Sequence, residues 1–426
     1  MSTRINVANR RLEPRHALAA GSLVLAAGQG MYTAAAVIYL TRVLGFSVTG
    51  VGIALSGAGI ASFVVSLPIG RLVDAVGART LTAALQLAKA VLMGLLAVTT
   101  SYPALFVILV LLGVANRGTQ IGWQALVADV AGPKDRVRVQ ALSRTAFNIG
   151  ISLGVLLAAL VLSASRRGPF EILLAGVAVC FAAAALLLVR LPTPHRVARE
   201  QAASTTPSRR PAPSFVLLGF VTGILALHIS ILEVAIPLWV SQDTTVSRST
   251  VSALLIVNTA LVIALQFRLS KPAGSVRGAT AVLAGSGVLI ALACLVFALT
   301  KGHGGWITLA LLVAATMLLT VGEILQQAAS WGLAFGLAPE GEQGRHLGAF
   351  SLGAALQDVA GPALVTVLVI QHAPGGWGVL AVLLLVSCTA VLPLANRARR
   401  YSERAAAAGA APASAESDDS EESRVP

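Results

Sequence analysis

The stretch Gly70-Arg71-Leu72-Val73-Asp74-Ala75-Val76-Gly77-Ala78-Arg79 brings three charged side chains between two apolar runs, 49–70 and 80–100. Each run is long enough to cross about 30 Å of hydrocarbon as a helix. Gly70 and Gly77 permit a tight reversal of the backbone at a membrane surface. Asp74 lies among basic neighbours and near helix ends, where a carboxylate can pair with a cation or cap a helix. The stretch therefore predicts a short turn between two membrane-spanning helices.

Apolar runs of similar length are found along the whole chain of 426 residues. We identify twelve, at roughly 17–41, 49–70, 80–100, 103–127, 141–164, 169–190, 214–240, 249–267, 279–300, 306–333, 347–370 and 376–395. Hydrophobic residues make up 56% of the chain and charged residues 12%, which is more apolar surface than one soluble core can bury. The runs lack the period-2 alternation of a membrane β-barrel. The sequence therefore predicts an all-α integral membrane protein with twelve transmembrane helices.

The basic residues are distributed unevenly between the loops that join these runs. With the N-terminus placed inside, the outside loops carry only five of the 31 Lys and Arg residues, namely Arg42, Arg166, Arg167, Arg248 and Lys301. Lys89 and Arg117 lie within spans, and the remaining 24 lie in inside segments, among them Arg144. Loops rich in Lys and Arg stay in the cytoplasm, so both termini are predicted to be cytoplasmic. This topology also accounts for the net charge of +13 without nucleic-acid binding.

A stretch rich in Pro, Ser and Arg divides the twelve runs into two sets of six and is typical of a linker. We therefore predict a cytoplasmic N-terminus at 1–16, a six-helix bundle at 17–190, the linker at 191–213, a second six-helix bundle at 214–395 and a disordered cytoplasmic tail at 396–426. An inside loop at the matching place in each half carries Pro and then charges. This duplication favours two six-helix pseudo-repeats.

Motifs of nucleotide-binding, metal and hydrolase sites are absent from the sequence or misplaced in it. No Lys follows Gly, so the phosphate-binding G-x-x-x-x-G-K loop is missing, and the six His show no zinc spacing. The pattern G-x-S-x-G occurs at Gly150–Gly154, but in the middle of a span rather than at a strand–turn–helix elbow. We interpret these two Gly as sites of close helix packing. The sequence therefore predicts no enzyme activity, no cofactor and no metal site.

Residues 70–79 resemble the signature of the major facilitator superfamily, G-x-L-x-D-R-x-G-R-R. The positions that match are Gly70, Leu72, Asp74, Gly77 and Arg79, whereas Ala75 and Ala78 replace two basic residues. In the family this loop acts as a latch between conformations, so the resemblance implies that role for Gly70, Asp74, Gly77 and Arg79. A turn that is merely structural is the alternative. The resemblance covers residues 15–397 and implies a secondary transporter.

The fourth span carries Arg117-Gly118-Thr119-Gln120-Ile121-Gly122, which resembles the R-x-x-Q-G motif of the same family with its Gly displaced by one position. In relatives that Arg is linked to proton coupling. An Arg in the middle of a bilayer is also unfavourable, by several kcal/mol, unless it is paired or faces water. Arg117 is therefore a candidate site residue on both grounds, and a structural ion pair is the alternative.

Two comparisons with drug/proton antiporters of the family point in different directions. The fifth span of those antiporters carries G-x-x-x-G-P-x-x-G-G, whereas here Gly154 is followed by Val155, which weakens the case for antiport. The stretches Asn116–Gly150 and Gly322–Gly361 nevertheless look like bacterial drug-efflux members. The resemblance therefore favours export over import.

Ionisable side chains within the spans are functional-site hypotheses, because an uncompensated charge is unfavourable in hydrocarbon. The candidates for proton coupling or substrate binding are Arg117, Lys89, Glu233, Glu323 and Asp358. Cations in one half and acids in the other suit a site at the interface between repeats. Burial favours the protonated form of a carboxyl group, which permits proton exchange. Neutral candidates for lining the cavity are Gln29, Tyr32, Gln120, Asn148 and Gln327, for which helix-packing hydrogen bonds are the alternative.

We predict a secondary active transporter that exports small amphipathic or drug-like molecules in exchange for protons, by alternating access. We expect a monomer in the bacterial plasma membrane, with a small-molecule substrate, protons and the lipid bilayer as partners and without nucleic acid. An importer or facilitator for a small nutrient or organic anion is the first alternative, which Lys89 and Arg117 would suit. A membrane sensor or scaffold that transports nothing is the second.

Overall fold

The structure is a computed structural model that describes residues 13–131, 135–162, 167–191, 210–244, 246–247, 249–339, 342–372 and 374–410. Within this part of the chain every regular element is helical. Eleven of the described helices are long and apolar enough to span a membrane. The remaining predicted span corresponds to α1 (Pro14–Ile38), which is not among these eleven. It has 25 residues, but they include the polar Gln29 and Thr33. The predicted all-α fold with twelve transmembrane helices is thus confirmed.

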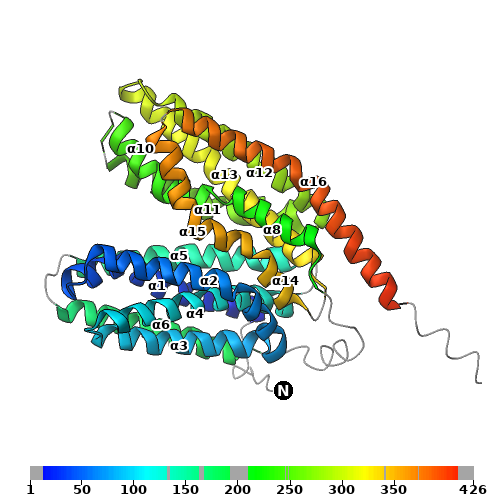
Figure 1. Cartoon of the computed structure of the whole chain (residues 1–426), viewed down its shortest axis with the longest axis horizontal. Coiled ribbons are helices and arrows are strands. Elements are labelled where there is room, and N and C mark those ends of the chain that lie inside the picture. The colour runs from blue at the N-terminus through cyan, green and yellow to red at the C-terminus, as the bar shows by residue number, and fades with distance from the viewer. Residues whose placement is uncertain are drawn as a thin grey trace, which may run out of the picture.

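The first six spans form one bundle, at the bottom of Figure 1. They are α1 with its π-helical end η2 (Tyr39–Val43), α2 (Val48–Val76), α3 (Ala78–Val98), α4 (Tyr102–Val130), α5 (Arg136–Leu162) and α6 (Arg167–Val189). Gly150 and Gly154 of α5 lie against the backbone carbonyls of Leu23 and Ala27 in α1, where a Cβ would collide. The G-x-S-x-G pattern therefore serves close helix packing, as its position within a span predicts.

The second six spans form the other bundle, at the top of Figure 1. The seventh span consists of α8 (Pro213–Leu225), α9 (His228–Ser230), η3 (Ile231–Ala235) and α10 (Ile236–Asp243), and the next three are α11 (Ser249–Leu269), α12 (Val276–Leu299) and α13 (Gly305–Leu337). The short η4 (Lys271–Gly274) precedes α12. The eleventh span is α14 (Gln343–Phe350), α15 (Leu352–Thr366) and η5 (Val367–Gln371), and the last is α16 (Gly375–Ala410).

The seventh span departs from a regular α-helix just before Pro237. Pro237, near the start of α10, has no N–H to donate to the carbonyl of Glu233, four residues earlier. The chain responds with the π-helical turn η3, which contains Glu233. Such turns often mark functional positions, because they aim one side chain away from the regular helical face.

The C-terminal end differs from the sequence-based prediction of disorder after residue 395. α16 continues through Ala410, because its last turns are rich in Ala, the best helix former, and because extending a helix is easier than starting one. Arg399 Nε lies 3.5 Å from the carboxylate of Glu403, one turn later, which adds modest support. Parts of three predicted segments lie outside the described residues: 1–12 of the N-terminus (1–16), 192–209 of the linker (191–213) and 411–426 of the tail (396–426).

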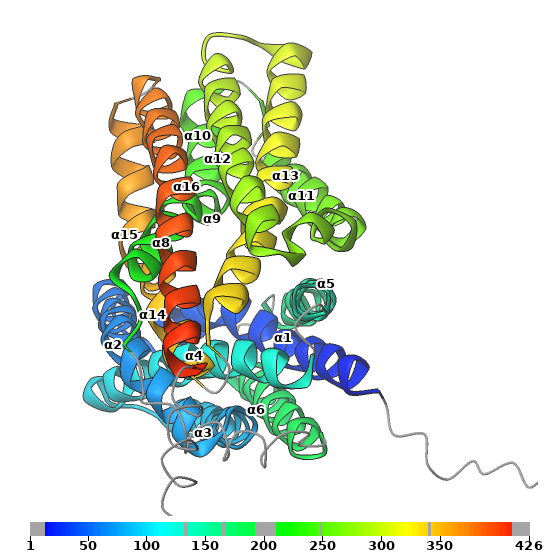
Figure 2. The same cartoon turned by 90° about the vertical axis from the view of Figure 1, so that its right-hand side faces the viewer.

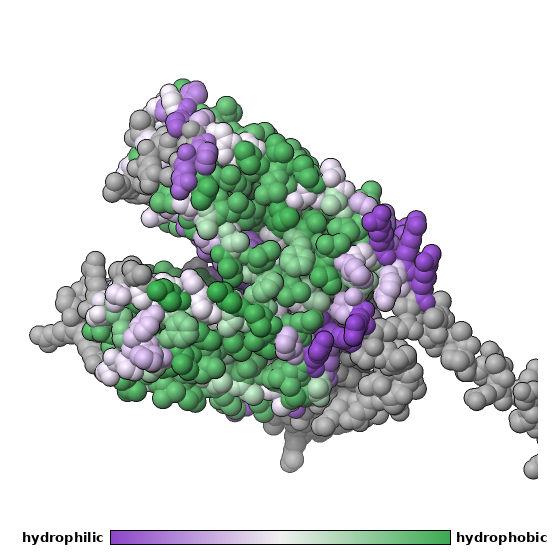
Figure 3. Space-filling view, in the orientation of Figure 1, coloured by the Kyte–Doolittle hydropathy of each residue, from purple (hydrophilic) through white to green (hydrophobic). Residues whose placement is uncertain are grey.

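The two bundles meet at one end and diverge at the other, as Figure 1 shows, and Figure 2 is a view toward the end where they meet. The end where they meet carries α14 and the turn between α2 and α3, and the opposite end carries α10. The space-filling view shows a cleft between the bundles that opens at the α10 end (Figure 3). Large apolar side chains such as Leu160 and Ile172 are more than 70% exposed on the outer surface, which suits contact with lipid.

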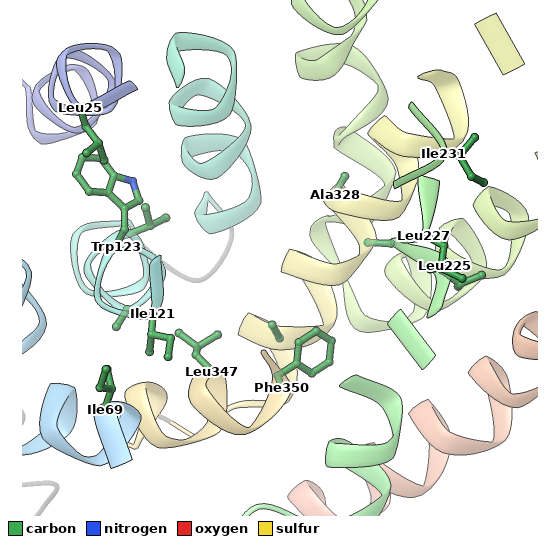
Figure 4. Close-up of a cluster of buried hydrophobic side chains, with 14 of the residues drawn as sticks. Leu25, Ile69, Ile121, Trp123, Leu225, Leu227, Ile231, Ala328, Leu347 and Phe350 are labelled. Atoms are coloured by element: carbon green, nitrogen blue, oxygen red, sulfur yellow. The ribbon is translucent and has the colours of Figure 1, made fainter. Parts of the chain in front are cut away.

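An apolar contact closes the cleft at the α14 end. Leu347 and Phe350 of α14 lie beside Ile121 of α4, with Ile69 of α2 close by (Figure 4). All four side chains are at most 8% exposed. Residues of both halves therefore share one packed core at this end. Arg117 lies one helical turn before Ile121 on α4, on the side of the open end.

Candidate functional site

Asp74 links the two halves at the closed end of the cleft. Its Oδ1 accepts a hydrogen bond from the N–H of Gly344 at 2.7 Å, and its Oδ2 accepts one from the N–H of Arg345 at 2.6 Å. Because α14 begins at Gln343, these N–H groups belong to its first turn and have no partner within the helix. A carboxylate of α2 in the first half thus caps a helix of the second half, where the helix dipole also favours negative charge.

Glycines allow α2 and α14 to approach closely beside this cap. A Cβ on Gly344 would lie 2.5 Å from the carbonyl oxygen of Gly70 and 2.8 Å from Asp74 Oδ1. A Cβ on Gly348 would lie 2.7 Å from the carbonyl oxygen of Ser66. Gly70 meets the backbone of Gly344 in the same way. Any side chain at these positions would push the two helices apart and lengthen the hydrogen bonds of Asp74.

The other two candidates in the turn act within the first half. Gly77 has a φ of 97°, which favours glycine, and it joins α2 to α3. Arg79 donates from Nη1 to the carbonyl oxygen of Leu191 at 2.6 Å, just after the end of α6. Gly77 and Arg79 therefore shape the turn, whereas Asp74 and Gly70 make the contact with the second half.

Arg117 and Asp358 form an ion pair between the halves. Nη2 of Arg117 in α4 lies 2.9 Å from Oδ2 of Asp358 in α15, and Nη1 donates to Oε1 of Gln120 at 3.0 Å. The Arg117 side chain is 5% exposed, whereas that of Asp358 is 53% exposed. One end of the pair is thus enclosed in the first half and the other faces open space.

Glu323 in α13 is held by amide groups of the second half. Its Oε2 accepts from Asn258 Nδ2 at 2.9 Å, and its Oε1 accepts from Gln327 Nε2 at 3.2 Å. Asn258, on α11, also donates to Thr320 at 3.0 Å. Gln327 thus lies in the polar cluster, as its spacing of four residues from Glu323 predicts.

Arg144 in α5 corrects the sequence analysis, which assigns this residue to an inside loop. The structure places it on the helix, where it interacts electrostatically with both Glu323 and Glu233 of the other half. Glu233, on η3, interacts in turn with Asp358. The three acids and the two arginines therefore form one electrostatic cluster that extends across the cleft, with one more acid than base. Charge counting by loop missed Arg144 because it assigned the residue to the inside segment, although the predicted span 141–164 contains it and α5 begins at Arg136.

His228 is a member of the cluster that sequence reasoning missed. It is 1% exposed, its Nδ1 lies 3.0 Å from the carbonyl oxygen of Leu225, and the charges of Glu323 and Arg144 both act on it. Asn258 was missed in the same way. In the sequence, each of the two is simply a polar residue inside an apolar run. Many residues that serve only helix packing have the same feature, so it does not identify a site residue.

Lys89 lies outside this cluster. It is 2% exposed in the middle of α3, and its Nζ lies 4.0 Å from the centroid of the Phe181 ring in α6. Gln86, one turn away, is fully buried, and neither of its amide atoms has a hydrogen-bond partner within the described part of the chain. The structure therefore places Lys89 in the interior of the first bundle.

The neutral candidates divide into two groups. Gln120 contacts Arg117, and Gln327 contacts Glu323. Gln29 and Tyr32 on α1 and Asn148 on α5 are partly buried, and Tyr32 packs against the apolar core. Gln120 and Gln327 thus hydrogen-bond to charged residues of the site.

Comparison with known proteins adds a family and a fold. Residues 18–227 match the family model of the Major Facilitator Superfamily. No curated protein sequence matches the chain. Among solved structures, the chain is similar to a bacterial homologue of the iron transporter ferroportin in an outward-facing state, with 16% identity, a TM-score of 0.71 and coverage of 92% of this chain and 100% of that one.

Two further structures share the fold. The human organic anion transporter MFSD10 (TETRAN) has 17% identity and a TM-score of 0.68, with coverage of 89% of this chain and 99% of that one. The transporter FucP in the outward conformation has 14% identity and a TM-score of 0.68, with coverage of 91% and 99%. At these identities the likeness establishes the fold alone.

Proposed function

Because the chain belongs to the major facilitator superfamily, we propose that it exports small amphipathic or drug-like molecules in exchange for protons, by alternating access. At a coarser level it is a membrane transporter rather than an enzyme. The observation that carries the proposal is the ion pair of Arg117 and Asp358. It joins the two halves through a carboxylate that can take up a proton and that is exposed to the cleft.

The orientation of the cleft supports export driven by external protons. The closed end carries the basic residues Lys271, Arg277 and Arg345, and basic loops stay in the cytoplasm. The open end then faces outward, the state in which two of the similar transporters were captured. Protons from outside reach Asp358 and Glu233 through this cleft.

Proton uptake links the protonation state of Asp358 to the movement of the two bundles. A proton on Asp358 removes its charge, so the attraction to Arg117 across 2.9 Å is weakened. The bundles at 17–190 and 214–395 are then free to rock, and the cap of Asp74 on α14 breaks as the inner end opens. Gly70, Asp74, Gly77 and Arg79 act in this scheme as the switch loop, with Asp74 and Gly70 forming the contact that breaks.

The proposal is tested in proteoliposomes that contain a pH-sensitive dye and carry an imposed pH gradient. A panel of amphipathic cations, anions and zwitterions is added, and proton movement is recorded. We expect proton movement with some of these compounds, and its loss in Asp358→Asn and Glu233→Gln. The control is Glu403→Gln, which removes a carboxylate from α16, outside the cleft. Proton coupling would be contradicted by a transport rate that does not depend on the pH gradient, or by transport that persists in both variants.

Uptake of a small organic anion is the second candidate. The observation that favours it is the presence of two arginines, Arg117 and Arg144, in the cluster that spans the cleft. Uptake of labelled organic acids into vesicles without any gradient would favour this candidate over export.

A further inference from the structure

We propose that a cavity beside the Arg117–Asp358 pair binds a small zwitterion, with the carboxylate of the ligand on Arg117 and its ammonium on Asp358. This inference rests on the proposed transport function and names the class of substrate. The cavity has a volume of about 200 Å³ and lies between α2, α4 and α15. It is therefore lined by both halves of the protein, with the ion pair in its wall.

The polar groups of the cavity leave unused capacity for hydrogen bonds. Nε of Arg117 lies below the surface of the cavity and has no acceptor within the described residues, so the guanidinium is not fully satisfied by the protein. Asp358 uses Oδ2 for Arg117, and its side chain is half exposed. Asn116 and Gln120 also line this space. The lining thus offers two side-chain amides beside the arginine and the second carboxylate oxygen of the aspartate.

The pairing of opposite charges favours a zwitterion over a ligand with one charge. The ion pair is neutral, so an amine bound to Oδ1 of Asp358 would leave the pair with a net positive charge. A carboxylate bound to Arg117 would leave it with a net negative charge. An uncompensated charge is unfavourable in a low-dielectric site. A ligand that supplies both charges is therefore favoured, because it leaves no charge of the site unpaired.

The size and walls of the cavity restrict the ligand further. An engineered cavity of about 150 Å³ accommodates benzene, so about 200 Å³ accommodates a molecule of roughly ten non-hydrogen atoms or fewer. The remaining wall is formed by Ala58, Gly59, Gly113 and Ala355, which offer no polar side chain, and by Ser62, whose hydroxyl donates to the carbonyl oxygen of Ala58 at 2.8 Å. These features suit an α-amino acid with a small apolar side chain.

Ligand binding of this kind would also affect the contact between the halves. The direct bond from α4 to α15 is replaced by a bond through the ligand, so each half holds one end of the same molecule. Loss of the ligand restores the direct pair. The substrate thereby participates in the interface that must rearrange during transport.

The test is ligand binding to the full-length protein in detergent, with no pH gradient. Three probes of matched skeleton are compared at millimolar concentration: L-leucine, 3-methylbutylamine, which lacks the carboxylate, and 4-methylpentanoate, which lacks the amine. The same set is repeated for alanine and valine. The readout is the shift in the midpoint of thermal unfolding. We expect at least one amino acid to raise the midpoint, with an affinity at least tenfold above those of its amine and acid analogues.

Variants connect the binding to the two charges. Arg117→Gln and Asp358→Asn should each abolish the preference for the amino acid, whereas Glu403→Gln and Lys89→Met, outside the cavity, should retain it. Equal binding of the amine or of the acid, or no shift with any amino acid, overturns the proposal. If no amino acid binds, the zwitterion proposal is rejected but proton-driven transport of other compounds is not. If amino acids bind and the proteoliposomes show no dependence on the pH gradient, proton coupling is rejected but the zwitterion site is not.

Discussion

Arg117 and Asp358 are 241 positions apart in the chain, yet a hydrogen-bonded ion pair of 2.9 Å joins them across the two halves of the transporter. Each comes from a different bundle. The pair lies between the open end of the cleft and the apolar contact that closes it. A second link, from Asp74 to the start of α14, lies at the closed end itself. Two carboxylates therefore join the halves, one exposed to the cleft and one that caps a helix.

Removal of one member of the ion pair should destabilise the protein more than removal of both. Asp358→Asn leaves Arg117 without its anion, so we expect a loss of about 1.5–3 kcal/mol, the usual worth of a hydrogen bond to a charged group. Arg117→Gln combined with Asp358→Asn should recover part of this loss. Thermal unfolding of the two single variants and the double variant gives the coupling energy, and a coupling near zero would contradict a direct interaction.

Asp74→Asn should favour the state in which the inner end is open. An amide oxygen accepts only one of the two N–H groups of α14 and lacks the charge that favours the helix N-terminus. The distance between spin labels at Val76 and Arg277, which both lie at the closed end, should therefore shift to longer values. Glu403→Gln is the control for removal of one carboxylate. An unchanged distribution of distances in Asp74→Asn would exclude a latch.

The contact between α2 and α14 should not tolerate a methyl group. In Gly344→Ala the new Cβ meets the backbone of Gly70 and the carboxylate of Asp74, so we expect a lower unfolding temperature and the same shift of the spin-label distance. Gly94→Ala is the matched control, because no atom lies within 4 Å of a Cβ there. This second change should be neutral or stabilising by up to about 1 kcal/mol, because Ala is the better helix former. Equal effects at both positions would argue against the packing constraint.

Lys89→Met should stabilise the protein without loss of proton-coupled transport. The ammonium is 2% exposed and, within the described residues, contacts the Phe181 ring rather than an anion. Methionine fills a similar volume without a charge. Arg144→Met provides the contrast, because it removes a cation that acts on Glu323 and Glu233 and should abolish coupling. Loss of transport in Lys89→Met would place this residue in the mechanism after all.

Residues 70–79 illustrate how much of the site can be predicted from a motif. Spacing and composition indicate a turn with a carboxylate near helix ends, and Asp74 does cap a helix. The identity of that helix was beyond prediction, because Gly344 is 270 positions away and carries no side chain that could mark it as a partner.

Lys89 and Arg144 show where prediction from composition fails. Both are single cations near or within apolar runs, and nothing local distinguishes them. Lys89 faces the interior of its own bundle, whereas Arg144 faces acids of the other half. Which direction a helix face points depends on how the bundle packs around it, and a linear pattern contains no such information.

The sequence by itself determined the number of spans, the turn of residues 70–79 and the candidate ionisable groups, because span length and hydropathy are properties of neighbouring residues. Only the tertiary structure decided which charges meet. Arg117 and Asp358 pair, Arg144 joins Glu233 and Glu323, and Lys89 is set apart, because electrostatic interactions act over a few ångströms of space whatever the separation along the chain.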